Sequence, residues 1–231
     1  MKKAFALLLI STMFMTTGCT TETTINNTTL SSKTAEPKKP LLTACPPLKD
    51  PQVEPPKKGD TVAVLDTDFG TIKFRLFTKD VPTLSKNFIE LSKSGKYDNT
   101  PFHRVVQGFM IQGGDFTNHD GTGGHSYLGP DKDLPNEIVP SLHHLCGTVS
   151  MAKTRAPVSI GSQFFIVTGP DGADFLDGGY SPIGQVYEGI DVAGKIEALQ
   201  IPETELPSEI VNVKKVTIMT YGDEETSPAQ N

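Results

Sequence analysis

Tryptophan is absent from this chain of 231 residues, and cysteine occurs only three times. The sequence has no run of about 18 or more apolar residues, which excludes a multi-pass membrane protein. Basic residues are outnumbered, with 21 Lys and Arg against 27 Asp and Glu, and this argues against nucleic-acid binding, which calls for clustered basic side chains. The 21 glycines and 18 prolines instead indicate many turns and a loop-rich or all-β fold.

The sequence also lacks cysteine and histidine pairs at the spacings that are typical of metal ligands. The sequence contains no CxxC pair and no pair of histidines at i, i+4. The histidines are His103, His119, His125, His143 and His144. Zinc sites combine such pairs with each other or with nearby thiolates, so we expect neither a metal nor a cofactor.

The amino terminus has the pattern of an export signal. Two lysines follow Met1, and the mostly apolar stretch Ala4–Met15 is too short to span a bilayer comfortably. Small residues before Cys19 resemble the bacterial lipobox, although Thr16 stands where an aliphatic residue is usual. We therefore expect a lipoprotein-type signal peptide over residues 1–18, a palmitate-type lipid on Cys19, and anchoring to the extracytoplasmic side of a cell membrane. The alternative is an ordinary secretory signal in which this cysteine is incidental.

Residues 19–58 have the composition of a tether. They are rich first in Thr, Asn and Ser and then in Pro and Lys, with too few apolar residues to offset the entropy of ordering them. We predict a disordered tether that holds a domain, residues 59–221, off the membrane. Cys45 in the tether and Cys146 in the domain could form a disulfide, but two free thiols are at least as compatible with the spacing. Residues 222–231 predict an acidic, flexible tail.

Strand patterns outnumber helix patterns in the domain. Apolar and polar residues alternate in Val62–Asp66 and Thr71–Phe77, and the turn chemistry between them predicts a β-hairpin. Further strand-like runs are 147–151, 164–167 and 211–219. Helical spacing occurs twice, from Pro82 to Gly95 and from Gly189 to Gln200. Many short strands with two helices predict a mainly β fold, a closed antiparallel barrel, rather than βαβ layers.

Two segments carry most of the functional information. Residues 102–116 read FHRVVQGFMIQGGDF, and residues 161–167 read GSQFFIV. Together with NHDGTGG at 118–124, VSMA at 149–152 and FLDG at 175–178, they resemble the cyclophilin family of peptidyl-prolyl cis-trans isomerases, over about residues 62–220. The resemblance implies an eight-stranded antiparallel barrel capped by two helices, with a substrate groove on its outer face. The glycine-rich stretch at 121–124 lacks the Lys-Ser/Thr ending of a phosphate loop and is expected beside the groove.

The chemistry of X-Pro bonds suits the residues in these segments. Rotation has a barrier of about 18–20 kcal/mol, and a donor to the prolyl nitrogen lowers it without a nucleophile or a metal. A guanidinium is always charged and offers a fixed fork of donors, so Arg104 suits this role. The resemblance assigns catalysis to Arg104 and Gln112. The substrate-binding residues that it implies are Phe109, Met110, Ala152, Gln163, Phe165, Phe175, Leu176 and Tyr180.

The sequence departs from many eukaryotic relatives at the edge of the expected groove. Phe175 stands where they have the tryptophan that supports tight cyclosporin binding, so we expect only weak binding of that ligand. Tyr180 stands near their pocket histidine, and the stretch 153–162 is one residue longer. Two functions remain open: an isomerase that assists the folding of exported, proline-containing polypeptides, and a tethered module that binds such polypeptides without turnover.

Overall fold

The structure is a computed structural model that describes residues 41–156 and 158–223. The predicted signal peptide, the lipid site at Cys19, the first part of the predicted tether and most of the predicted tail lie outside these residues. Within them, no helix is long and apolar enough to cross a membrane.

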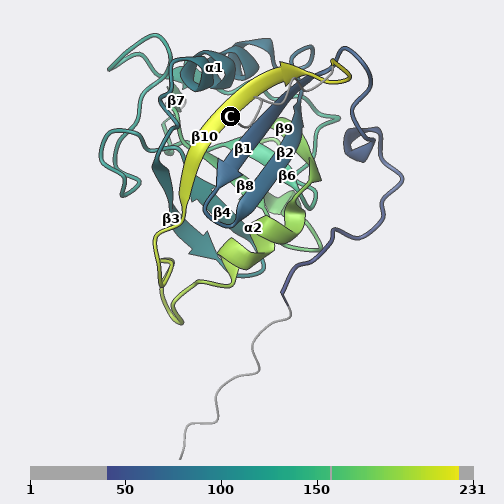
Figure 1. Ribbon diagram of the computed structural model, residues 1–231. Helices are drawn as coiled ribbons and strands as arrows, with labels where there is room; N and C mark the ends of the chain where they lie inside the picture. Colours follow the sequence, from purple (N-terminus) through teal and green to yellow (C-terminus); the bar gives the residue numbers. More distant parts are fainter. Residues whose placement is uncertain (1–40, 157, 224–231) are drawn as a thin grey trace, which may run out of the picture. The chain divides into compact units, whose positions relative to one another are not determined.

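Eight antiparallel strands form a closed barrel in the order β1-β10-β3-β4-β8-β6-β9-β2 (Figure 1). They are β1 (Thr61–Thr67), β2 (Gly70–Leu76), β3 (Thr100–Val106), β4 (Met110–Gly113), β6 (Thr148–Met151), β8 (Phe164–Val167), β9 (Ser181–Glu188) and β10 (Asn212–Thr220). This confirms the predicted fold. The predicted hairpin is β1 and β2, while β3, β4 and β9 had no strand prediction of their own because their residues do not alternate clearly.

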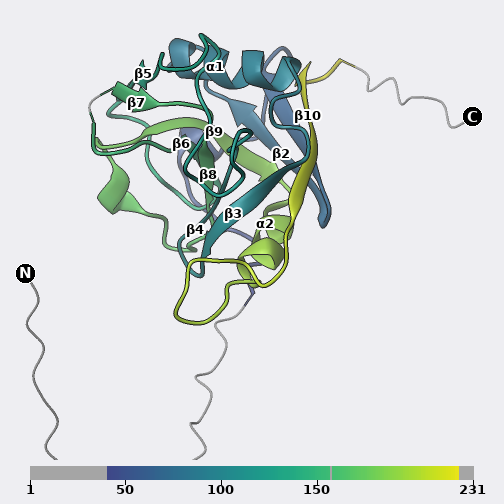
Figure 2. The ribbon, with the colours of Figure 1, turned by 90° about the vertical axis from the view of Figure 1, so that its left-hand side faces the viewer.

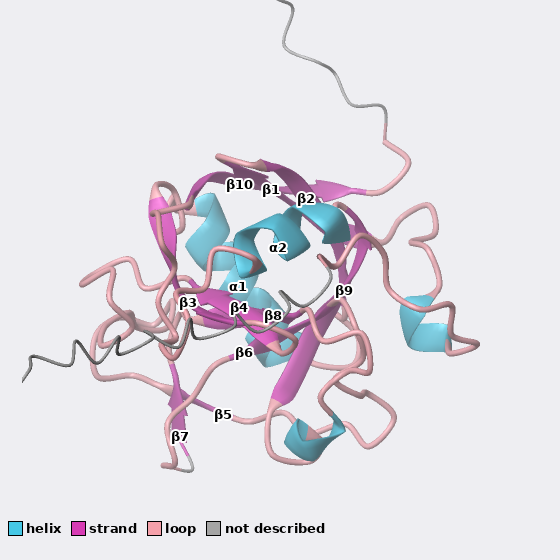
Figure 3. Ribbon diagram, turned by 90° about the horizontal axis from the view of Figure 1, so that it is seen from below, coloured by secondary structure: helices cyan, strands magenta, loops and turns pink. Residues whose placement is uncertain are grey.

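The two helices lie at opposite ends of the barrel (Figures 1 and 3). Helix α1 (Pro82–Lys93) begins with proline at its first position and is followed by Gly95 at φ +68°, a left-handed conformation that ends the helix. Helix α2 (Ile190–Glu197) is shorter than its predicted range. The remaining elements are the two-stranded sheet of β5 (Leu134–Pro135) and β7 (Val158–Ile160) and the 3₁₀ helices η1 (Pro51–Val53) and η2 (Asp174–Leu176).

Aromatic rings fill the barrel interior. Phe164 is fully buried, and its ring contacts those of Phe88, Tyr97 and Phe102 edge-on. Phe102 and Phe164 therefore belong to the barrel core. Phe116 is only half-buried and packs against it.

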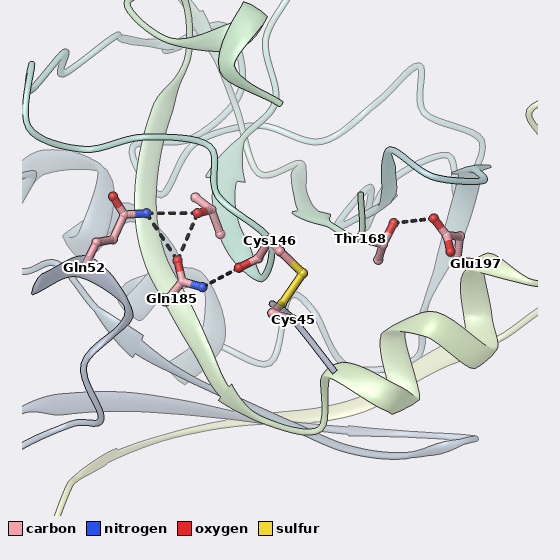
Figure 4. The surroundings of a disulfide bond; sticks show 7 residues. Cys45, Gln52, Cys146, Thr168, Gln185 and Glu197 are labelled. Carbon is pink, nitrogen blue, oxygen red and sulfur yellow. Dashed lines mark hydrogen bonds between the residues drawn. A yellow bond between two sulfur atoms is a disulfide. The ribbon is translucent and has the colours of Figure 1, made fainter. Parts of the chain in front are cut away.

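The tether prediction is wrong for residues 41–58, which we call the clasp. This segment packs on the barrel: Leu42 is buried, and Cys45 forms a disulfide with Cys146 (Figure 4). Gln52 is buried as well, and its side-chain amide donates to Thr148 Oγ1 at 2.9 Å and to Gln185 Oε1 at 3.2 Å. Composition failed here because one cross-link and a few buried polar contacts, rather than an apolar face, hold the segment in place.

Candidate active site

A cavity of about 300 Å³ opens on the outer face of the barrel beside β3, β4 and β8. Its lining residues are Arg104, Phe109, Met110, Gln112, Ala152, Lys153, Phe165, Phe175, Leu176 and Tyr180. Every residue predicted for catalysis or substrate binding except Gln163 therefore lies here. Gln163 lines an adjoining cavity of about 260 Å³, together with the glycine-rich stretch 121–124 that was expected beside the groove.

Strand register explains why these residues meet. Arg104 of β3 is paired with Gln112 of β4, Gln112 with Phe165 of β8, and Phe165 with Ser150 of β6. Directly paired residues of antiparallel strands project from the same face of the sheet, so the four side chains form one row on the outside of the barrel. Their strand neighbours, such as Ile111 and Ile166, belong to the interior core instead. Figure 2 shows β3 and β4 side by side beneath α1.

A chain of hydrogen bonds fixes the polar side of the cavity. Arg104 Nη1 donates to Gln112 Oε1 at 3.1 Å, and Gln112 Nε2 donates to Gln163 Oε1 at 2.9 Å. Gln163 Nε2 donates in turn to the carbonyl oxygens of Gly121 and Gly123, at 2.9 and 2.8 Å. Each side chain is thereby oriented by the next, and Gln163 belongs to the site although it does not line the main cavity.

The loop at the end of this chain is built around a buried carboxylate. Asp115 accepts backbone hydrogen bonds from Thr117, Asn118, Gly121 and Gly123 at 3.0–3.1 Å. Burial raises the pKa of Asp115, but these four donors outweigh it and hold the pKa well below its ordinary range. The loop is therefore held by one ionised side chain.

Sequence reasoning missed two charged residues of the site. Glu205, from the loop between α2 and β10, accepts from Arg104 Nε at 2.6 Å. This hydrogen bond lowers the pKa of Glu205, which favours its carboxylate form beside the guanidinium. Lys153 lines the cavity with its ammonium group 4.9 Å from the centre of the Tyr180 ring. No local pattern links Arg104 to Glu205, since they are 101 residues apart in the chain.

The apolar side of the cavity is a cluster separate from the barrel core. Met110 and Phe165 are buried in it, and Phe109, Leu176 and Tyr180 are partly buried against them. Phe175 is 72% exposed and reaches the cavity from its rim, with its ring centre 5.3 Å from that of Phe109. The cavity thus combines a deep apolar floor with one guanidinium at its side.

Helix α2 supports the turn that carries Phe109. Its buried Glu197 accepts hydrogen bonds from the backbone N–H of Gly108 and from Thr168 Oγ1, the latter at 2.7 Å (Figure 4). These contacts connect the end of the barrel closed by α2 to the edge of the cavity.

The family model for the cyclophilin type peptidyl-prolyl cis-trans isomerase/CLD matches residues 62–218. This chain belongs to the cyclophilin family. The enzyme class expected from the sequence is thus confirmed at the level of the family, whose curated relatives are named for peptidyl-prolyl isomerisation.

Relatives of known sequence and structure agree with this assignment. The cypE isomerase of Dictyostelium discoideum is 40% identical over 159 residues, which are 68% of this chain and 97% of that protein. Peptidyl-prolyl cis-trans isomerase 9 of Schizosaccharomyces pombe is 39% identical over 158 residues, but the match covers only 25% of that protein. A crystal structure of a Cryptosporidium parvum cyclophilin superimposes with a TM-score of 0.65 at 34% identity, covering 70% of this chain and 98% of that one. A second structure of that protein, in the presence of the dipeptide Ala-Pro, gives 0.64 at 35% identity, covering 69% and 99%.

Proposed function

We propose that this cyclophilin accelerates rotation about X-Pro bonds in exported polypeptides, with Arg104 stabilising the twisted amide. One observation carries the proposal: a guanidinium held between Glu205 and Gln112 stands beside an apolar cavity large enough for a proline ring. Binding the ring alone would not require a cation fixed in this way.

The donor acts on the nitrogen of the rotating bond. Amide resonance is lost during rotation, so the prolyl nitrogen becomes pyramidal and more basic, and it accepts a hydrogen bond better than in the planar ground state. An interaction that strengthens in the transition state lowers the barrier. The guanidinium of Arg104 is oriented before substrate arrives, and an apolar surrounding strengthens its electrostatic effect.

The other residues bind and align the substrate in this proposal. Met110, Phe165 and Leu176 hold the proline ring, and Phe109, Phe175 and Tyr180 form the walls and rim around it. Gln112 and Gln163 hold the substrate backbone while keeping Arg104 in place, and Ala152 borders the path of the chain before proline.

A protease-coupled assay on an Ala-Pro peptide tests the role of Arg104. We expect Arg104→Ala to lower kcat/KM by roughly a hundredfold, as the loss of one preorganised donor does in other enzymes. Lys195→Ala is the control, since it removes an exposed cation of α2 that is paired only with Asp191. If wild type and Arg104→Ala catalyse equally slowly, the protein is a binding module instead.

We also propose that the enzyme is lipid-anchored through Cys19 on the extracytoplasmic side of a membrane. The charged and apolar pattern before Cys19 supports this, and so does the disulfide between Cys45 and Cys146, because such bonds persist in oxidising compartments. Labelled palmitate should enter the wild type but not Cys19→Ser, and a variant with serine at both Cys45 and Cys146 should still be labelled. Labelling of none of these proteins would favour plain secretion.

A further inference from the structure

Behind the cavity lies a buried imidazole for which the proposed chemistry has no role. The side chain of His144 is fully buried, and its ring centre is 6.0 Å from that of Phe165 in a nearly parallel arrangement, at 12°. It also stands edge-on to the Tyr180 ring at 6.5 Å, while Phe165 and Tyr180 contact each other at 5.9 Å. The three rings pack together, so the position of His144 bears on two walls of the cavity.

Both ring nitrogens of His144 are engaged. Nδ1 lies 2.7 Å from Asp177 Oδ1, and Nε2 lies 3.0 Å from Ser150 Oγ. A carboxylate can only accept, so Nδ1 donates to Asp177 and Nε2 accepts from the Ser150 hydroxyl. Burial lowers the pKa of His144 despite the opposing effect of Asp177, in keeping with a neutral imidazole that bonds in this way.

The order Ser150–His144–Asp177 is that of a nucleophile triad, but it cannot serve as one. Ser150 is fully buried in the row that continues from Phe165, and no substrate reaches its hydroxyl. The arrangement therefore holds neighbouring groups in place rather than transferring a group.

His144 also clamps the turn that carries Phe175 and Leu176. At the start of this turn, Ala173 N donates to the carbonyl oxygen of His144 at 2.7 Å. At its end, the carboxylate of Asp177 accepts from the His144 backbone N–H at 2.9 Å as well as from the imidazole. The segment 173–177 is thus tied to one residue at both ends, with Leu176 facing the cavity between them.

We infer that His144 is a positioning residue for the proline-binding cavity, acting through Asp177 on Leu176 and through ring packing on Phe165 and Tyr180. This inference rests on the proposed function of the cavity. Because the cavity grips the proline ring before and during rotation, loss of His144 should weaken substrate and transition state alike, raising KM rather than lowering kcat.

Steady-state kinetics of His144→Phe test this on the Ala-Pro peptide. Phenylalanine keeps a ring against Phe165 but removes the acceptor of Ser150 and one of the donors to Asp177, which keeps only the His144 backbone N–H and His143. We expect KM to rise about tenfold, the size of effect that follows when a buried hydrogen-bonded pair loses one member, with kcat within about threefold of wild type. His144→Asn restores a donor towards Asp177 and should recover part of the loss.

His143→Ala is the matched control. His143 donates to the other oxygen of Asp177 at 2.8 Å, but its side chain is 46% exposed, and the histidine that packs against Phe165 and Tyr180 is His144. The His143→Ala variant should therefore have a KM near the wild-type value. Asp177→Asn, at a partly exposed side chain, serves as a second variant if His144→Phe does not fold, and should raise KM in the same direction.

Two readouts separate this inference from the proposed function. Titration of the peptide against the protein by NMR measures affinity without turnover, and Arg104→Ala should lose kcat while keeping that affinity. Weakened binding in His144→Phe, with partial rescue by His144→Asn, supports the positioning role. Unchanged KM and affinity in folded His144→Phe and in Asp177→Asn, or an equal loss in His143→Ala, would overturn it whatever the activity of the wild type.

Discussion

Two adjacent phenylalanines should have opposite roles. Phe164 points into the barrel and is fully buried among Phe88, Tyr97 and Phe102, whereas Phe165 points outward into the cavity. Replacing a core phenylalanine with alanine costs about 3–5 kcal/mol, so Phe164→Ala should lower Tm by roughly 6–20 °C. Phe165→Ala should cost only about 1–2 kcal/mol, because the space it leaves adjoins a cavity that water can enter.

Activity should follow the reverse order. The proline ring loses an apolar wall in Phe165→Ala, which should lower kcat/KM by roughly tenfold to a hundredfold. Phe164→Ala, assayed well below its Tm, should stay within about threefold of wild type because the outward row from Arg104 to Phe165 is retained. Circular dichroism melts and the protease-coupled assay measure the two effects. Equal losses of activity, or a lower Tm for Phe165→Ala than for Phe164→Ala, would refute the separation of core and cavity.

Three further outcomes are expected. Replacing both Cys45 and Cys146 with serine removes a cross-link over 101 residues, which in the chain-entropy model stabilises the fold by up to about 4.7 kcal/mol. The Tm of this variant should therefore be lower than that of wild type. An unchanged Tm would contradict the disulfide. Asp115 has a lower pKa in the folded protein than in the unfolded protein, where it is 3.8. Its carboxylate therefore stabilises the folded state fully at pH values above 3.8, and this stabilisation is lost as the pH falls below 3.8. The difference in free energy of unfolding between wild type and Asp115→Asn, measured with urea, should therefore shrink between about pH 5 and pH 2. A constant difference would argue against stabilisation of the Asp115 carboxylate by its four backbone donors. Cyclosporin should inhibit Phe175→Trp more strongly than wild type, because tryptophan at this exposed rim position should improve binding of the ligand. Equal inhibition of the two proteins would show that residue 175 does not limit cyclosporin binding.

Local sequence patterns predicted the elements whose contacts are local. The hairpin of β1 and β2 pairs Val62 with Arg75 across a short turn, and alternation is visible because the barrel surface there is partly exposed. Helix α1 was predicted from Pro82 at its start and Gly95 after its end, and both have those roles. In each case the residues that specify the element lie within it.

The cavity could not be derived from periodicity, and resemblance to the family was needed. Strands β6 and β8 are buried at every position, since one face packs in the barrel and the other beneath the cavity. A strand buried on both faces appears in the sequence as a continuous apolar run. Such a run does not show that Phe164 faces the barrel interior and Phe165 the cavity. The register that aligns Arg104, Gln112 and Phe165 is set by pairing between segments distant in sequence.

The clasp shows that local sequence composition also misplaced the start of the domain. Composition predicts that the domain begins at residue 59, but Gln52 bonds both backbone groups of His143, accepting from its N–H and donating to its carbonyl oxygen. His143 and His144 both donate to Asp177, at the end of the turn that forms one wall of the cavity. Residues 41–58 are therefore linked by hydrogen bonds, through His143, to the Asp177 end of that turn, and they belong to the folded domain. A shortened protein intended to retain native behaviour should accordingly begin before Leu42 rather than at residue 59.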